Sequence, residues 1–169
     1  RMAPKDDAAD DFNADLGPAY APVTDEELHG YYYEDLRVGM TAVFSKTVTE
    51  ADIVAFAGVS GDTNPVHLSE QFGQAGMFEG RIAHGMLSAA YISTLIGTKL
   101  PGPGAIYMGQ TLKFMAPVRA GDTVNTRVTV RELNDEKARV ILDTVCLVGE
   151  DVVIEGEALI KVPLRDPPD

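Results

Sequence analysis

Two residues that can exchange protons lie close together in the sequence, at Asp62 and His67. They belong to residues 61–67, GDTNPVH, in which the Asn-Pro pair predicts a rigid turn. A carboxylate and an imidazole at one place can orient a water molecule and move its protons, because imidazole titrates near neutral pH. Taken alone, an Asp-x-Asn-Pro run is usually only a turn with Asx hydrogen bonds, and a lone histidine is usually structural.

A second run of interest covers residues 81–86, RIAHGM, and leads into the strongly apolar segment 86–96. A segment that is apolar on nearly every side predicts a buried helix, which we expect Gly97 to end. The N–H of Gly85 would then lie at the positive end of that helix, where it can stabilise a developing oxyanion. Glycine at this position would also let a ligand approach the backbone closely. We expect His84 to hold the start of the helix.

Most other segments predict strands. Residues 41–48 and 106–115 each predict one strand, and residues 124–131, 139–148 and 152–162 predict three more that are joined by short turns as an antiparallel meander. Residues 50–58 predict a helix with a capping box from Thr49 to Asp52, and residues 60–80 predict an irregular overhang with a short helix at 69–72. The expected fold class is α+β, with an antiparallel β-sheet wrapped around a central apolar α-helix.

Composition divides the 169 residues into one domain with two flanking segments. Residues 1–35 hold ten acids and two bases, out of a net charge of −12. We interpret them as an acidic, partly disordered N-terminal extension, residues 36–163 as the folded domain, and 164–169 as a C-terminal tail. The single cysteine, Cys146, is expected to be a small core residue.

The same composition argues against several classes of partner. A basic patch of the kind that binds nucleic acid is missing from the sequence, and apolar runs stay shorter than the ~18 residues that a membrane span needs. The expected location is cytoplasmic. The strand at 139–148 is apolar on both faces, which predicts a homodimer or higher homo-oligomer, because only one face can pack on the chain's own helix.

The pattern of motifs resembles the MaoC-like (R)-specific enoyl-CoA hydratases, which include hydratases that feed polyhydroxyalkanoate synthesis. The similarity runs from about Val38 to Val162 and rests on four motifs in order: Asp62-x-Asn64-Pro65-x-His67, His84-Gly85-Met86, Gly109-Gln110, and Phe114-x-x-Pro117-Val118-x-x-Gly121-Asp122. The resemblance implies a hot-dog fold, a homodimer, and syn addition of water to a trans-2-enoyl-CoA to give an (R)-3-hydroxyacyl-CoA.

The resemblance also implies roles for individual residues. It implies that Asp62 and His67 form the catalytic dyad, that the N–H of Gly85 binds the thioester oxygen, and that Ser93 supports the site. Supporting or substrate-binding roles are further expected for Asn64, His84, Phe72 and Tyr91, with Met77 and Phe78 as weaker candidates for the substrate lining. Either member of the dyad can serve as the base, because coupled groups share their protons. No cofactor is expected, since coenzyme A is part of the substrate.

Three alternatives compete with this interpretation. Asp62, His67 and His84 could form a two-histidine, one-carboxylate metal site, but they lack the i, i+4 spacing of a preformed helical site, and no metal is expected. The same fold hosts acyl-CoA thioesterases, which generally lack the Asp-x-Asn-Pro-x-His run. A non-catalytic acyl-CoA-binding regulator would need a DNA-binding extension, and residues 1–35 are acidic and predict no helix-turn-helix.

Overall fold

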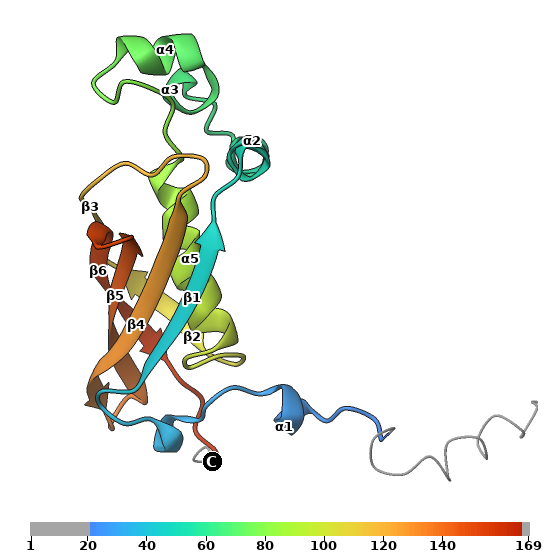
Figure 1. Ribbon diagram of the computed structural model, residues 1–169. Coiled ribbons are helices and arrows are strands. Elements are labelled where there is room, and N and C mark those ends of the chain that lie inside the picture. Colours follow the sequence, from blue (N-terminus) through green and yellow to red (C-terminus); the bar gives the residue numbers. More distant parts are fainter. Residues whose placement is uncertain (1–20, 167–169) are drawn as a thin grey trace, which may run out of the picture.

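A computed structural model describes residues 21–166, and in this part of the chain six strands form one antiparallel sheet (Figure 1). The strand order is β1-β4-β5-β6-β2, and β3 also pairs with β6. The strands are β1 (Thr41–Thr47), β2 (Ile106–Gln110), β3 (Lys113–Phe114), β4 (Thr123–Asn134), β5 (Arg139–Val148) and β6 (Asp151–Lys161). None of the helices between residues 21 and 166 has the length and apolar character to cross a membrane.

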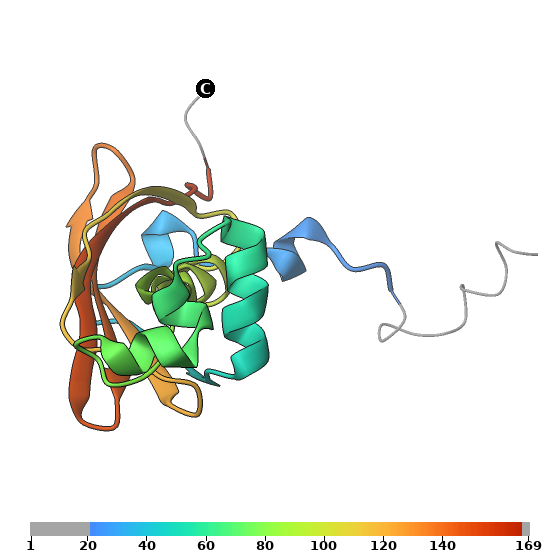
Figure 2. The ribbon, with the colours of Figure 1, turned by 90° about the horizontal axis from the view of Figure 1, so that it is seen from above.

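The sheet curves around one helix, α5 (Gly85–Thr98), which lies on its concave side (Figure 2). Ile92, Leu95 and Ile96 of α5 are almost completely buried. Burial of side chains of this size stabilises a fold by about 1.5–3 kcal/mol each. The predicted α+β arrangement, an antiparallel sheet around an apolar helix, is therefore confirmed.

Alternating side chains of the central strands supply the other half of the core. Val124, Thr126 and Val128 of β4 and Leu142, Thr144 and Cys146 of β5 are buried, whereas the residues that alternate with them are exposed or half-buried. This period of two is expected when one face of a sheet packs on a core. The prediction that Cys146 is a core residue is confirmed, and burial raises the pKa of its thiol.

Three helices form an overhang beyond one end of the sheet: α2 (Glu50–Ser60), α3 (Pro65–Leu68) and α4 (Glu70–Ala75) (Figure 1). The predicted capping box of α2 is present, since Thr49 Oγ1 accepts from the N–H of Asp52 and the Asp52 carboxylate accepts from the N–H of Thr49. The overhang holds more helix than the single short helix predicted at 69–72, because Asn64 and Ser69 each cap a separate helix.

Two other predicted boundaries differ from the structure. Gly97 was expected to end the central helix, but α5 continues to Thr98, and the carbonyl of Leu95 then accepts from the N–H groups of Lys99 and Leu100. The strand predicted at 106–115 is divided into β2 and β3, because the chain leaves the regular ladder at Thr111.

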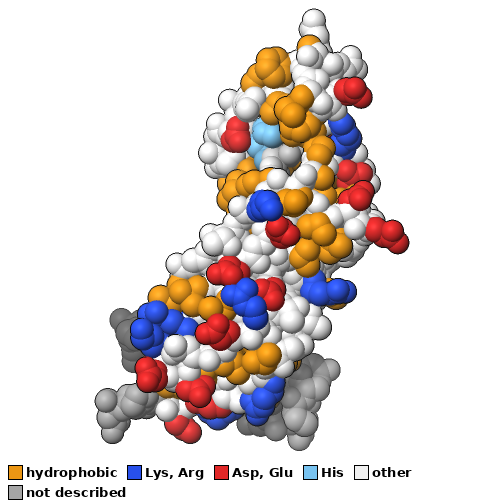
Figure 3. All heavy atoms as spheres, turned by 90° about the vertical axis from the view of Figure 1, so that its left-hand side faces the viewer, with side chains coloured by type: hydrophobic (Ala, Val, Ile, Leu, Met, Phe, Trp, Pro, Cys, Tyr) orange, Lys and Arg blue, Asp and Glu red, His pale blue; other side chains and the backbone are white. Residues whose placement is uncertain are grey.

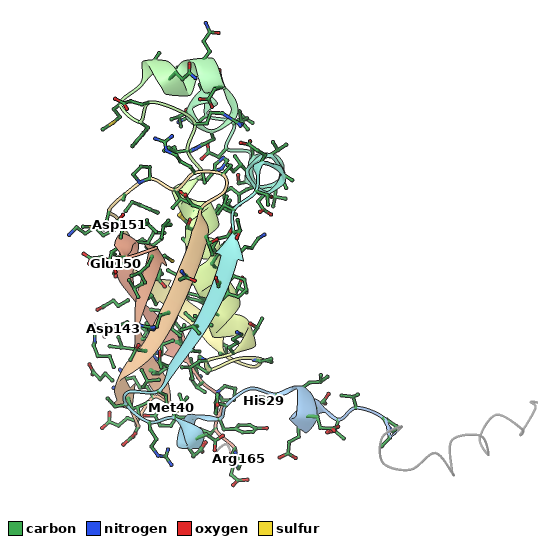
Figure 4. All side chains as sticks on the ribbon, in the orientation of Figure 1. His29, Met40, Asp143, Glu150, Asp151 and Arg165 are labelled. Atoms are coloured by element: carbon green, nitrogen blue, oxygen red, sulfur yellow. The ribbon has the colours of Figure 1, made fainter. Side chains whose placement is uncertain are left out.

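The segment before the sheet is attached to the domain from about residue 29 onward. It contains α1 (Asp25–Leu28) and a short 3-10 helix, η2 (Tyr33–Asp35). The buried Tyr33 donates its N–H to Pro163 O (2.9 Å) and its hydroxyl to Asp135 (2.7 Å), and burial raises its pKa to about 12. Arg165 lies over the ring of Tyr32 at the same end of the molecule (Figure 4). Residues 1–20 of the predicted disordered extension lie outside the described residues.

We expect Gly156→Ala to destabilise the protein, because a Cβ at this position in β6 would lie 1.9 Å from the carbonyl oxygen of Thr111. Relieving that contact requires the backbone to move, which should lower the free energy of unfolding by about 1–3 kcal/mol. Gly97→Ala is the matched control, since its Cβ would meet nothing within 4 Å, and alanine favours a helix by up to about 1 kcal/mol. Urea denaturation of both variants measures the difference, and equal stabilities would contradict the role of the Thr111 contact.

Candidate active site

Asp62 and His67 lie where α2 is followed by α3. Gly61 ends α2 with a left-handed backbone (φ 77°), and Asp62 follows directly. Asn64 then caps α3, its side-chain oxygen accepting from the N–H of Val66 (3.2 Å), and places His67 on the third residue of that helix. As a result, Asp62 Oδ2 and His67 Nε2 lie 4.0 Å apart.

The imidazole of His67 is fixed by a backbone group on the next segment of the chain. Its Nδ1 lies 2.9 Å from the carbonyl oxygen of Ile82, and a carbonyl can only accept. Nδ1 therefore carries the proton in the neutral ring, and Nε2 presents its lone pair towards Asp62. The side chain of His67 is 11% exposed and that of Asp62 is 51% exposed, so the pair joins a buried base to a carboxylate in contact with solvent.

His84 connects this pair to the central helix. Its Nε2 lies 2.9 Å from the backbone carbonyl oxygen of Asp62, and its ring stacks on that of His67 with a centroid separation of 3.8 Å. His84 is also the residue immediately before α5 and is 2% exposed. The His84 side chain makes no capping hydrogen bond to α5, and it instead joins the residue before the helix to the backbone of Asp62.

A cavity of about 390 Å³ opens beside these residues. Its polar lining includes Asp62, His67, His84 and Ser88, and the rest of its wall is mostly apolar. The apolar side comprises Phe78, Ile82, Ala83, Met86, Phe114, Met115, Ala116, Pro117, Val118, Val153 and Ile154. Figure 3 shows histidine atoms at the surface of this end of the molecule, surrounded by hydrophobic side chains. The arrangement suits a ligand with an apolar chain and one reactive polar group.

Gly85 also lines the cavity and is the first residue of α5. Its N–H has no acceptor within the helix, because the first four N–H groups of a helix lack such partners. A side chain here would collide with the ring of Phe114, since an added Cβ would lie 2.6 Å from Cε1. The backbone at the helix start is therefore accessible from the cavity only because residue 85 is glycine.

The structure brings together some of the predicted site residues and not others. Asp62, His67, His84, Gly85 and Phe78 line the cavity, and Asn64 positions the dyad through the turn. Four others lie elsewhere: Phe72 and Met77 are exposed on the overhang, Ser93 is exposed on α5, and Tyr91 is buried in the core against Phe44. Burial raises the pKa of Tyr91 to about 12.

A metal ion is poorly matched to the three polar residues, although ligand atoms of Asp62, His67 and His84 lie within 4.8 Å of one another. The two imidazole rings are stacked with an interplanar angle of 29°. Imidazole binds a metal through a lone pair in its own plane, so stacked rings direct their lone pairs side by side instead of at a shared ion. Two imidazoles fixed in this way favour proton transfer over coordination.

Sequence reasoning did not anticipate Ser88 or the contribution of β6 to the cavity. Val153 and Ile154 come from β6, and their place depends on how the sheet curves, which the alternating pattern does not specify. A signal for Ser88 was present in the sequence, because it is a hydroxyl among apolar residues, three positions after Gly85.

Comparison with known proteins identifies the family of this chain. The model of the MaoC like domain family matches residues 37–150. The chain is 54% identical to the (R)-specific enoyl-CoA hydratase of Rhodospirillum rubrum over 140 residues, which cover 83% of this chain and 97% of that protein. It is 50% identical to the 3-hydroxybutyryl-CoA dehydratase of Methylorubrum extorquens, covering 85% and 91% of the two chains.

Comparison with a solved structure shows that the similarity includes the fold. The (R)-hydratase from Aeromonas caviae involved in PHA biosynthesis superposes with a TM-score of 0.75 at 42% identity, covering 77% of this chain and 99% of that one. This likeness bears out the hot-dog fold that the sequence motifs imply. The region that the family model matches contains the Asp62–His67 turn, His84, Gly85 and β3, and the chain belongs to the MaoC-like dehydratase family.

Proposed function

We propose that the protein hydrates trans-2-enoyl-CoA thioesters to (R)-3-hydroxyacyl-CoA thioesters, or catalyses the reverse dehydration. The observation that carries this proposal is the 4.0 Å separation of Asp62 Oδ2 and His67 Nε2 at a largely apolar cavity that also contains Gly85 at the start of α5. The (R) configuration follows the names of the related hydratases, at 42–54% identity.

The dyad can hold and activate one water molecule. Asp62 Oδ2 and the lone pair of His67 Nε2 lie 4.0 Å apart, and a single water between them can donate one hydrogen bond to each. The oxygen lone pair of that water is then free to add to C3 of the enoyl group. One proton passes to the dyad as the C–O bond forms, and one passes from the dyad to C2 on the same face. The dyad thereby returns to its initial protonation state, and the addition is syn.

The thioester oxygen gains negative charge while the enolate exists, and the start of α5 can stabilise it. The N–H of Gly85 is directed away from the helix, at the end where the helix dipole is positive. In other enzymes, one preorganised donor of this kind increases kcat by a factor of about 10²–10³. Neither this donor nor the dyad requires a cofactor.

An acyl-CoA thioesterase and a non-catalytic acyl-CoA-binding protein remain the competing functions. An enoyl-CoA substrate separates all three, because hydration removes the conjugated absorbance without releasing a thiol, whereas hydrolysis releases coenzyme A. A binding protein would do neither. We expect the absorbance to fall with no free thiol, and thiol release at a matching rate would favour the thioesterase.

We also propose that the protein is a homodimer, formed through the β2 edge of the sheet. The outer face of β5, from which the sequence predicted an interface, is half-buried and is crossed by ion pairs from Arg131 to Asp143 and Glu157. By contrast, Ile106, Tyr107 and Met108 of β2 are exposed. No strand within residues 21–166 pairs with the free side of β2. Exposed apolar edges are generally covered in native proteins, and a second copy would do so here.

Replacing either member of the dyad should abolish most of the activity. We expect Asp62→Asn and His67→Ala each to lower kcat for crotonyl-CoA by about 10²–10⁴-fold, the usual contribution of a positioned acid or base. Asp151→Asn and His29→Ala are matched controls, because neither residue lines the cavity. Circular dichroism checks that each variant is folded, and near wild-type turnover in a folded dyad variant would refute the assignment.

Activity should not depend on a metal ion. Prolonged dialysis against a chelator is expected to leave kcat unchanged, because the proposed steps use only side chains, one backbone N–H and water. Loss of activity that a single added metal restores would instead support coordination by Asp62, His67 and His84.

The proposed interface predicts a specific change in mass. Light scattering of the wild type should give twice the chain mass of 18.1 kDa, and Met108→Lys should shift it to the single chain, because it places a charge on the β2 edge. Val59→Lys changes an equally apolar and more exposed residue of α2, and should leave the mass of the dimer unchanged. A wild type that is monomeric and fully active would contradict the dimer.

A further inference from the structure

Ser88 carries a buried hydroxyl group that bonds to nothing in the described part of the protein. The residue is 1% exposed, and its Oγ has no hydrogen-bond partner within residues 21–166. Leaving a buried hydroxyl unpaired costs about 1–3 kcal/mol, so native proteins rarely retain one without a use. Ser88 also lines the cavity next to the dyad.

Other helical hydroxyl groups of this protein behave differently. Ser60 donates to the carbonyl of Phe56 at 2.6 Å, and Thr98 donates to that of Thr94 at 2.7 Å. Thr94 likewise donates to Ala90 O. Each follows the usual bond to the carbonyl four residues earlier, which satisfies the hydroxyl within the helix. Ser88 does not make this bond, so its buried hydroxyl has no hydrogen-bond partner within residues 21–166.

The position of Ser88 on α5 places it beside Gly85. Residues three apart lie on the same face of a helix, and side chains lean back over the turn that precedes them. The Ser88 hydroxyl therefore lies over the turn that begins at Gly85, and both residues line the same cavity. The sulfur of Cys146 donates to the backbone carbonyl of Ser88 at 3.7 Å, which leaves the hydroxyl itself free.

We propose that the Ser88 hydroxyl donates a second hydrogen bond to the thioester oxygen of the substrate. A carbonyl oxygen has two lone pairs, and the N–H of Gly85 occupies only one of them. The cavity that Ser88 lines is otherwise mostly apolar, with Val153, Ile154 and Met115 in its walls, and the proposed mechanism assigns Asp62 and His67 to the water. The inference rests on the proposed function. The proton stays on Ser88 throughout, and its bond strengthens as the oxygen gains charge.

The test compares Ser88→Ala with Thr94→Ala, which removes an exposed hydroxyl from the same helix. We expect Ser88→Ala to lower kcat for crotonyl-CoA by about 10²-fold, as for other oxyanion donors. The Kd for butyryl-CoA should change by less than about threefold, because a saturated thioester develops no enolate charge. The kcat of Ser88→Cys, whose thiol is a weaker donor, should lie between those of the wild type and Ser88→Ala. Thr94→Ala should match the wild type.

Thermal unfolding separates this role from a structural one. Since the Ser88 hydroxyl has no hydrogen-bond partner within residues 21–166, Ser88→Ala should not lower Tm. A kcat of Ser88→Ala within about twofold of the wild type would overturn the inference, since one donor is worth far more. So would a lowered Tm together with weaker binding of butyryl-CoA. A wild type that does not hydrate crotonyl-CoA would instead refute the proposed function itself.

Discussion

The burial of α5 against the concave face of the sheet is the constraint on which the rest of the molecule depends. Its sides are apolar almost all round, so it is stable only when the sheet curves far enough to cover it. That curvature brings β3 and β6 past the first turn of the helix, where Val153 and Ile154 form one wall of the cavity. The same packing that stabilises the protein thereby shapes the site.

A second constraint on the site comes from two histidines that form hydrogen bonds with backbone carbonyl groups. His67 is held by Ile82, and His84 holds the backbone of Asp62. Because His84 immediately precedes α5, the dyad and the helix start are parts of one connected unit. Water activation at one end of the enoyl group and stabilisation of charge at the other can therefore occur at a fixed separation, as efficient catalysis requires.

The sequence was most informative where local chemistry decides the structure. The capping box of α2, the apolar helix and the alternating strand β4 all follow from side-chain patterns within a few residues. Predictions failed where distant parts of the chain meet: the ladder breaks at Thr111, whose carbonyl oxygen lies against Gly156 of β6.

The same distinction applies to the site. The motif around Asp62 and His67 could be identified from spacing. Ser88, by contrast, could be identified only in the structure, because its side chain is buried and its hydroxyl has no hydrogen-bond partner within residues 21–166. Tyr91 and Ser93 share α5 with Ser88 but face the core and the surface of the chain, since a helix turns by about 100° per residue. Deciding which face of that helix meets the cavity required the three-dimensional arrangement.

The hydrogen bonds of His67 and His84 to backbone carbonyl groups also divide the overhang into two parts. One part is held in place by these bonds, and the other can be exchanged. The Val66 carbonyl accepts from the N–H of Ile82, so the segment from 68 to 81 leaves and rejoins the domain at almost the same point. Closing a longer loop between such pinned ends costs little extra free energy. Phe78 of this segment reaches the cavity wall, but the dyad does not belong to it. Insertions or exchanges there can reshape the acyl-binding wall while the reacting groups keep their geometry, which makes the segment a natural place for relatives to diverge in substrate and for engineers to alter it.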